Sequence, residues 1–213
     1  MSSSEQPRLA RWLACAEALV IFGLIIFYIW WMRFRYPRFW ILILALVIAS
    51  HVIRRESLSR IGFGLSGAGR CFADLWPSLA FAGAVILALG LLCRSIRQVS
   101  WEGALSALAV YLVWGLFQQY LLNGYFLNRL SEYARHQARV PPMTAILFSL
   151  AHTPNWFLML ASLAGGYICG WIFFRYRNLY FLGVAHGVIG FLLYLTVPDS
   201  ISHHLYVGPK WFF

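Results

Sequence analysis

Three side-chain amides interrupt a long apolar stretch of this chain, and two histidines occupy similar settings further along it. The amides are Gln118, Gln119 and Asn123, and the histidines are His152 and His186. Buried amides and imidazoles need hydrogen-bond partners, because leaving them unpaired in an apolar medium costs free energy. Imidazole can also accept or donate a proton near neutral pH. These residue types therefore indicate a polar site inside an apolar protein, with acid–base chemistry available to it.

Helix geometry brings these groups to a similar depth. Gln119 and Asn123 are four residues apart and share a helix face, whereas Gln118 lies about 100° around the helix. At about 1.5 Å per residue, Gln118, His152 and His186 lie roughly 10–13 Å from the same end of their segments. One buried histidine is more often a packing residue than a catalyst, but several polar groups at one level in a membrane usually mark a functional site. We therefore expect these side chains to face one another in a shared recess.

The composition of the chain indicates a membrane protein. Of its 213 residues, 61% are hydrophobic and 11% are charged, whereas a soluble domain carries about 25% charged residues. Since a helix satisfies every backbone N–H and C=O group without water, the apolar runs predict an all-α, polytopic membrane helix bundle. The net charge of +10 comes from arginines between the apolar runs, where anionic headgroups attract them. No nucleic-acid partner is therefore expected.

About seven segments are predicted to cross the membrane, one of them short or kinked. They cover about residues 12–32, 39–53, 76–93, 101–126, 143–155, 156–174 and 179–197. The short segment is 143–155, and Pro154 within it permits either half of a kinked helix or a short tilted helix. The single membrane domain is divided into an N-terminal part with two spans and an interfacial segment (1–74), a core (75–197) and a tail (198–213).

The charged residues predict the orientation of the bundle. With seven crossings, eleven arginines lie on the side of the N-terminus, and five arginines with Lys210 lie on the other side. The positive-inside rule then places the N-terminus in the cytoplasm. As an integral membrane protein, the chain is expected in the inner membrane of a bacterium. Arg129 belongs to the eleven and is expected in a polar loop. Glu17, Glu56 and His51 are expected near the membrane surfaces.

Small residues recur at four-residue spacing in the last two long segments. The repeats are Ala161 and Gly165, then Ser162, Gly166 and Gly170, then Gly183 and Gly187. Such spacing lets helix backbones approach closely in lipid. It predicts close packing of the sixth segment on the seventh.

The polar residues fall in three ordered motifs that resemble those of a known family. Residues 118–124 (QQYLLNG) stand where that family has Glu-Glu-x-x-x-Arg-Gly, and residues 148–152 (FSLAH) match Phe-x-x-x-His without change. Residues 186–190 (HGVIG) keep the histidine of His-x-x-x-Asn and lose the asparagine. In order, spacing and setting, residues 75–197 resemble the CAAX protease and bacteriocin-processing family. These are glutamic intramembrane peptidases that include the type II CAAX prenyl endopeptidases.

The resemblance implies a membrane-embedded endopeptidase with a site at the motif positions. In the family, the first glutamate and the histidine of the second motif activate a water, and the last histidine and asparagine stabilise the oxyanion. Carried over, the catalytic positions are Gln118, Gln119, His152 and His186, and the substrate-binding positions are Asn123, Phe148 and Gly190. A glutamine amide cannot accept a proton near neutral pH, so Gln118 cannot serve as the general base.

Two functions remain open from the sequence. The first is a peptidase in which His152 is the remaining base and His186 polarises the carbonyl. The second is a non-catalytic member that binds a hydrophobic or lipidated peptide, or a partner membrane protein, in the inherited cavity among membrane lipids. A transporter or channel is less well supported, since no acidic relay or internal repeat is visible. No cofactor or metal is expected, because two histidines fall short of the three protein ligands of a zinc site.

Overall fold

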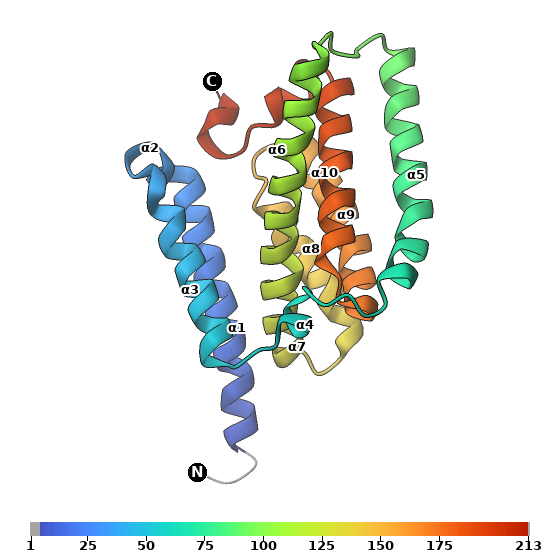
Figure 1. The fold of residues 1–213 in the computed structure, drawn as a ribbon. Coiled ribbons are helices and arrows are strands. Elements are labelled where there is room, and N and C mark those ends of the chain that lie inside the picture. The colour runs from blue at the N-terminus through green and yellow to red at the C-terminus, as the bar shows by residue number, and fades with distance from the viewer. Residues whose placement is uncertain (1–4, 213) are drawn as a thin grey trace.

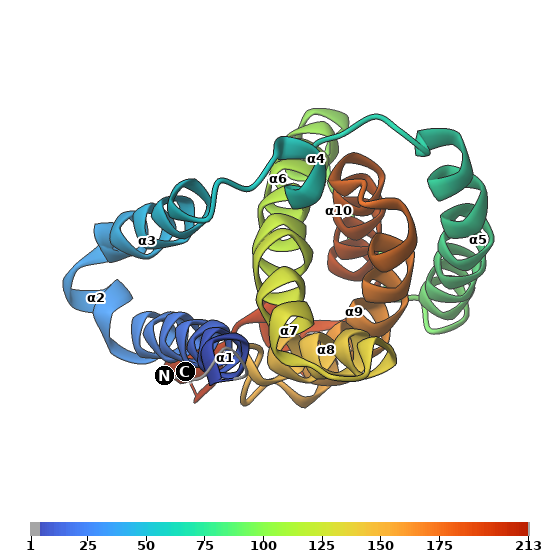
Figure 2. The same cartoon turned by 90° about the horizontal axis from the view of Figure 1, so that it is seen from below.

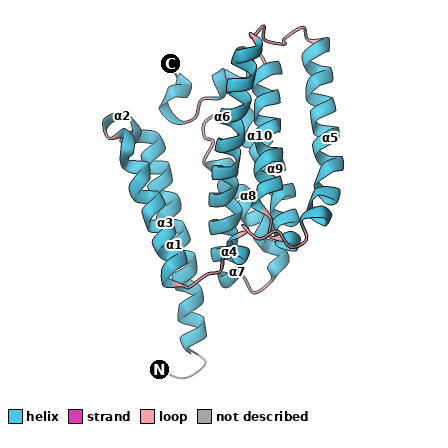
Figure 3. Cartoon of the chain, in the orientation of Figure 1, coloured by secondary structure: helices cyan, strands magenta, loops and turns pink. Residues whose placement is uncertain are grey.

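The structure is a computed structural model that describes residues 5–212, which form a bundle of helices without a β-strand (Figures 1 and 3). Five continuous helices in this range are long and apolar enough to cross a membrane: Arg8–Arg35, Ala68–Leu92, Trp101–Tyr133, Trp156–Tyr176 and Leu179–Thr196. Two shorter apolar helices, Pro37–Ile53 and Val140–Leu150, accompany them. The all-α polytopic membrane bundle that the composition predicts is confirmed.

Each predicted span corresponds to a helix of the bundle. The helices are α1 (Glu5–Phe27), α2 (Arg33–Arg35), α3 (Trp40–Ile53), α4 (Leu58–Ile61), α5 (Ala68–Leu92), α6 (Trp101–Gln119), α7 (Asn128–Tyr133), α8 (Val140–Leu150), α9 (Trp156–Tyr176), α10 (Leu179–Thr196) and α11 (Asp199–Ser202). A π-helical stretch, Tyr120–Leu127, joins α6 to α7 without a break, and another, Tyr28–Met32, joins α1 to α2. The two termini lie at opposite ends of the bundle (Figure 1).

Two helix ends differ from the prediction. The helix of the third predicted span begins at Ala68, inside the stretch expected to lie on the lipid surface. The helix of the fourth predicted span continues to Tyr133, beyond the start of the expected polar loop. Both extensions carry polar side chains that have partners within the protein: the Tyr176 hydroxyl donates to Asp74 across 2.6 Å, and Arg129 is buried among carboxylates. A polar residue at a span end therefore does not mark the end of the helix.

Helices α1 and α3 form a hairpin at one side of the bundle, and α5 lies at the opposite side (Figures 1 and 2). Between them, α6 and α8 to α10 form the core, and α1 packs on α7. The chain crosses from the hairpin to α5 through α4 and residues 62–67, which are held by backbone bonding of Leu179 N–H to Gly62 O at 2.8 Å. The hairpin and the core are thus two separate groups of helices, connected at one end by this crossing.

The short segment is a separate helix rather than half of a kinked one. Helix α8 begins with Pro141 in its first turn and ends at Leu150, and a turn at 151–155 containing Pro154 leads into α9. A Cβ built at Gly166 of α9 would lie 3.3 Å from Ala145 Cα, and one built at Gly170 would lie 3.2 Å from Pro141 Cβ. As the residue number increases along α9, the residue number of the contact on α8 decreases, so the two helices are antiparallel.

The small residues of α9 and α10 pack on different partners, so the predicted packing of these helices on each other is wrong. Gly187 of α10 lies against α6, where an added Cβ would lie 2.7 Å from Leu112 Cα. Gly166 and Gly170 of α9 face α8 instead, and α10 has far more contact with α6 than with α9. Small residues at four-residue spacing mark a face for close approach. They do not specify which helix approaches it.

Candidate functional site

The amides of the first motif form a hydrogen-bonded chain that ends on a histidine of α10. Asn123 Nδ2 donates to Gln119 Oε1 at 2.5 Å, and Gln119 Nε2 lies 3.0 Å from His186 Nδ1. Gln119 and Asn123 are 1% and 0% exposed. With the Gln119 oxygen accepting from Asn123, its amide nitrogen donates to His186, so the Nδ1 of that imidazole accepts. The neutral ring then carries its proton on Nε2, as a donor.

One polar atom of these hydrogen-bonded side chains has no partner. Asn123 Oδ1 is buried and accepts no hydrogen bond from any described residue. Exchanging the oxygen and nitrogen positions of the amides leaves an unpaired nitrogen instead, so one orphan atom persists in either assignment. Such atoms are rare in folded interiors. The position that carries a cation in the family motif is thus under-satisfied in this chain.

The two histidines are held around the ring of Phe148. Its centroid lies 4.8 Å from that of His152 and 5.7 Å from that of His186. His152 Nδ1–H donates to the Phe148 carbonyl at 2.7 Å, because a carbonyl can only accept. The neutral His152 ring therefore has its lone pair on Nε2. One histidine offers an acceptor and the other a donor, which is the pair of functions that binding of a polar amide requires.

Gln118 and His152 line a large apolar cavity between the hairpin and the core. The cavity has a volume of about 890 Å³, and its walls come from α1, α3, α6, the following π-helical stretch and α8. Its apolar lining includes Phe22, Ile43, Val113, Trp114, Phe117 and Leu147. Among the described residues, Arg33 at the turn of the hairpin is the one charged residue of the lining, and none of the lining residues is acidic. This is the volume of a drug-sized or larger ligand site.

The structure brings most of the expected site residues together. Gln119, Asn123 and His186 share hydrogen bonds, Phe148 contacts both histidines, and Gln118 reaches the cavity that His152 also lines. Gln119, Asn123 and His186 do not line this cavity, so the expected shared recess holds only part of the set. Gly190 is also outside the cavity wall and lies beneath an aromatic ring: a Cβ built there would be 2.9 Å from Tyr111 Cδ1. The Tyr111 ring thus covers the position where the family motif has its asparagine.

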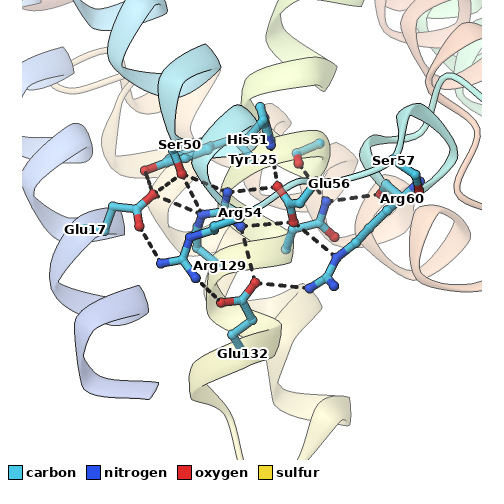
Figure 4. Close-up of polar contacts among 12 residues, drawn as sticks. Glu17, Ser50, His51, Arg54, Glu56, Ser57, Arg60, Tyr125, Arg129 and Glu132 are labelled. Carbon is cyan, nitrogen blue, oxygen red and sulfur yellow. Dashed lines mark hydrogen bonds and ion pairs between the residues drawn. The ribbon is translucent and has the colours of Figure 1, made fainter. Parts of the chain in front are cut away.

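A network of ion pairs lies at the end of the hairpin nearest the N-terminus (Figure 4). Arg129 of α7 is fully buried and contacts three carboxylates: Glu17 of α1 at 3.0 Å, Glu56 at 2.9 Å and Glu132 at 3.3 Å. Arg54 bridges Glu17 and Glu132 at 2.6 Å each. We call these five residues the ion-pair cluster. It joins both helices of the hairpin to the core, and so it fixes one end of the cavity wall.

The buried state of the cluster corrects three placements made from the sequence. Arg129 is 0% exposed and lies in a helix, although it was expected in a polar loop. His51 and the side chain of Glu56, both expected near the surface, are buried, with the His51 Nδ1 atom 2.5 Å from Glu56. One sequence feature could have indicated this burial. Glu17 lies inside one predicted span and Arg129 lies at the same end of another, so the two opposite charges could pair with each other. Charges that can pair within a bundle need not reach headgroups.

Glu56 makes the cluster sensitive to acid. Burial raises the pKa of this carboxyl, but the hydrogen bonds from His51 and Arg129 and the charge of Arg129 outweigh burial and lower it from 4.5 to about 2. A depressed pKa contributes stability that is present above the unfolded value and lost as the pH falls toward the folded one. The difference in melting temperature between wild type and Glu56→Gln should therefore shrink from pH 5 to pH 3. Thermal unfolding in detergent measures this difference in melting temperature. A difference that stays constant from pH 5 to pH 3 would contradict the lowered pKa of Glu56. Glu102→Gln, at an exposed position, is the control.

Comparison with known proteins addresses the core of the bundle. The family model described as "Type II CAAX prenyl endopeptidase Rce1-like" matches residues 100–192, which contain all three motifs and most of α6 to α10. The match covers 93 of the 213 residues, slightly less than half of the chain. No curated protein and no solved structure matches the chain. Residues 100–192 are therefore similar to the type II CAAX prenyl endopeptidase Rce1-like family, in agreement with the resemblance of the motifs.

Proposed function

We propose that this CAAX-protease-like membrane protein binds a lipidated or hydrophobic peptide, or a hydrophobic segment of a partner membrane protein, in the cavity between the hairpin and the core. The observation that carries the proposal is the 890 Å³ apolar cavity with Gln118 and His152 in its wall. An apolar chain gains about 25 cal/mol per Å² on leaving water. The few polar groups then orient the peptide beside it. The lack of an acidic residue in the lining supports binding without efficient cleavage.

A peptidase is the second candidate function, and one observation favours it. The hydrogen bonds leave an acceptor on His152 Nε2 and a donor on His186 Nε2, both beside Phe148. In this reading His152 takes a proton from the attacking water and His186 polarises the substrate carbonyl. Without the carboxylate of the family, the loss of a positioned base costs about 10²–10⁴-fold in rate. Turnover by the wild-type protein would accordingly be slow.

The proposed setting is the inner membrane of a bacterium, with the N-terminus in the cytoplasm. The excess of arginines on the side of the N-terminus supports this orientation through the positive-inside rule. The ion-pair cluster and Gln118 then lie toward the cytoplasmic half of the bundle. A labelling experiment with a membrane-impermeant thiol reagent on single-cysteine variants at either terminus tests the orientation.

A cavity-filling substitution tests the binding proposal. Ala109 of α6 lines the cavity, and Ala80 of α5 is exposed outside it. We expect Ala109→Trp to weaken binding of a fluorescent farnesylated peptide by about tenfold, since loss of roughly 1.4 kcal/mol of apolar contact has that effect. Ala80→Trp should bind as wild type does, and the same peptide without the farnesyl group should bind to neither. Equal affinities of the two tryptophan variants, measured by fluorescence anisotropy in detergent, would place the ligand elsewhere.

A further inference from the structure

A second hollow lies on the surface where α5 begins and α9 ends, away from the apolar cavity. Its volume is about 420 Å³, and its lining is polar: Ser57, Ser59, Arg60, Ser66, Gly67, Arg70, Arg175, Tyr176 and Arg177. We call it the arginine groove. Because α5 and α9 are both long enough to cross a membrane, their ends place the groove at the level of one membrane surface. This position is independent of the function proposed for the cavity.

The four arginines of the groove are not balanced by acids of their own. Arg60 is engaged by the carboxylates of the ion-pair cluster at 3.0 and 3.1 Å, whereas Arg175 has an exposed pair with Asp74 at 3.6 Å. Arg70 has no ion pair among the described residues, and it is exposed. Burial and the positive charge of Arg60 lower the pKa of Arg177. Positive charge is thus crowded here, and at least Arg70 and Arg175 are available to an anion.

The backbone of the groove adds donors to these charges. Gly67 is the residue before the first turn of α5, with a left-handed φ of 73°, and no side chain caps this helix. At the start of this 25-residue helix, Ala68 N–H donates to Leu65 O at 3.2 Å, and the N–H groups of Gly69 and Arg70 have no acceptor among the described residues. A helix N-terminus also carries a partial positive charge. An anion in the groove would thus meet these N–H groups as well as the arginines.

Exposed apolar side chains surround the groove. Leu58 and Leu65 are 69% and 74% exposed, and Phe72 and Trp76 on the first turns of α5 are 47% and 53% exposed. Large apolar groups of this kind beside arginines are typical of the zone between acyl chains and headgroups. A free anion from solution would make no favourable contact with these apolar side chains. A lipid supplies the anionic head and the apolar chains together.

We propose that the arginine groove binds the phosphate of an anionic phospholipid headgroup, with the acyl chains lying along the exposed apolar residues of α4 and α5. Arg70 and Arg175 would pair with the phosphate, and the N–H groups at the start of α5 would donate to it. Such a lipid would fix the crossing between the hairpin and α5 at the membrane surface.

Lipid retention by the full chain tests the proposal. The protein in dodecyl maltoside is titrated with dioleoyl phosphatidylglycerol, with dioleoyl phosphatidylcholine, and with inorganic phosphate, and bound lipid is counted by native mass spectrometry. Each basic residue near an anionic surface is worth about fivefold in affinity. Two arginines together are then worth about 25-fold, so we expect Arg70→Gln with Arg175→Gln to weaken the binding of phosphatidylglycerol by about that factor. The matched control is Arg135→Gln with Arg139→Gln, which removes the same charge from exposed positions outside the groove.

Three results would overturn the proposal. One is an equal loss of phosphatidylglycerol binding in the two double variants, because a general attraction between arginines and the anionic lipid would then explain the binding. Another is equal retention of both lipids by wild type. The third is binding of inorganic phosphate alone with the affinity of phosphatidylglycerol, which would make the groove a site for a free anion. Melting temperatures without added lipid verify folding, and Arg70→Gln alone, which removes no ion pair among the described residues, replaces the double variant if it unfolds.

Discussion

Replacing Arg129 by leucine is expected to lower the free energy of unfolding by about 3–5 kcal/mol, the usual cost of removing one partner from a buried charge pair. Arg129 is 0% exposed and contacts Glu17, Glu56 and Glu132, and the side chain of Glu56 is only 2% exposed. Without the guanidinium, Glu56 keeps only His51 and the exposed Arg60 as partners. The three carboxylates then repel one another at the base of the hairpin. Unfolding by titration with sodium dodecyl sulfate measures the effect.

Arg60→Gln is the matched control, because this arginine contacts the same Glu56 and Glu132. Its side chain is 49% exposed, and an ion pair of this kind contributes about 0–1 kcal/mol. A double variant, Arg129→Met with Glu56→Leu, should recover part of the loss, since an apolar pair can replace a buried ion pair without penalty. If Arg129→Leu cost no more than Arg60→Gln, the cluster would not be what holds the hairpin against the core.

The sequence was sufficient to predict the helices but not the partners of each helix. Apolar length identifies α1, α5, α6, α9 and α10 because a span must cover the hydrocarbon thickness. Pairing depends on shape, which periodicity does not specify: the glycine pattern of α10 indicated a close contact, and the structure places that contact on α6 rather than on α9. Loops as short as 177–178 between α9 and α10 join helices that have little contact with each other.

The site shows a similar division. The polar residues of the motifs could be located by depth, and Gln119, Asn123 and His186 do share hydrogen bonds. A recess was expected, but its second wall could not be foreseen, because α1 and α3 precede the motifs and lie outside the matched residues 100–192. Arg129 could not be placed either, since the sequence alone cannot tell a headgroup partner from three carboxylates brought together by folding. Long-range pairing decides both.

Replacing Gln118 by glutamate is expected to raise the rate of peptide cleavage by about 10²–10⁴-fold, the range that a positioned general base contributes. Gln118 lines the cavity together with His152, whose Nε2 is free to accept a proton. A carboxylate at this position would face the same space as a peptide whose lipid occupies the apolar part of the cavity. The amide of glutamine has the same size but cannot take the proton from water. The substitution therefore changes the chemistry with little change in packing.

The measurement is cleavage of a farnesylated peptide by the purified protein in detergent, followed by mass spectrometry of the products. Gln118→Met serves as the control of similar size without a carboxylate, and His152→Ala in the Gln118→Glu background should abolish any turnover gained. Cleavage that appears only in Gln118→Glu would identify a binding protein that keeps the geometry of a peptidase. Cleavage already present in wild type and removed by His152→Ala would favour the peptidase instead, with the histidine as its base. Binding of the farnesylated peptide by Gln118→Glu with no cleavage would show that the Gln118 side chain does not reach the peptide bond, and the role of His152 in the wall of the cavity would then be recognition of the peptide alone.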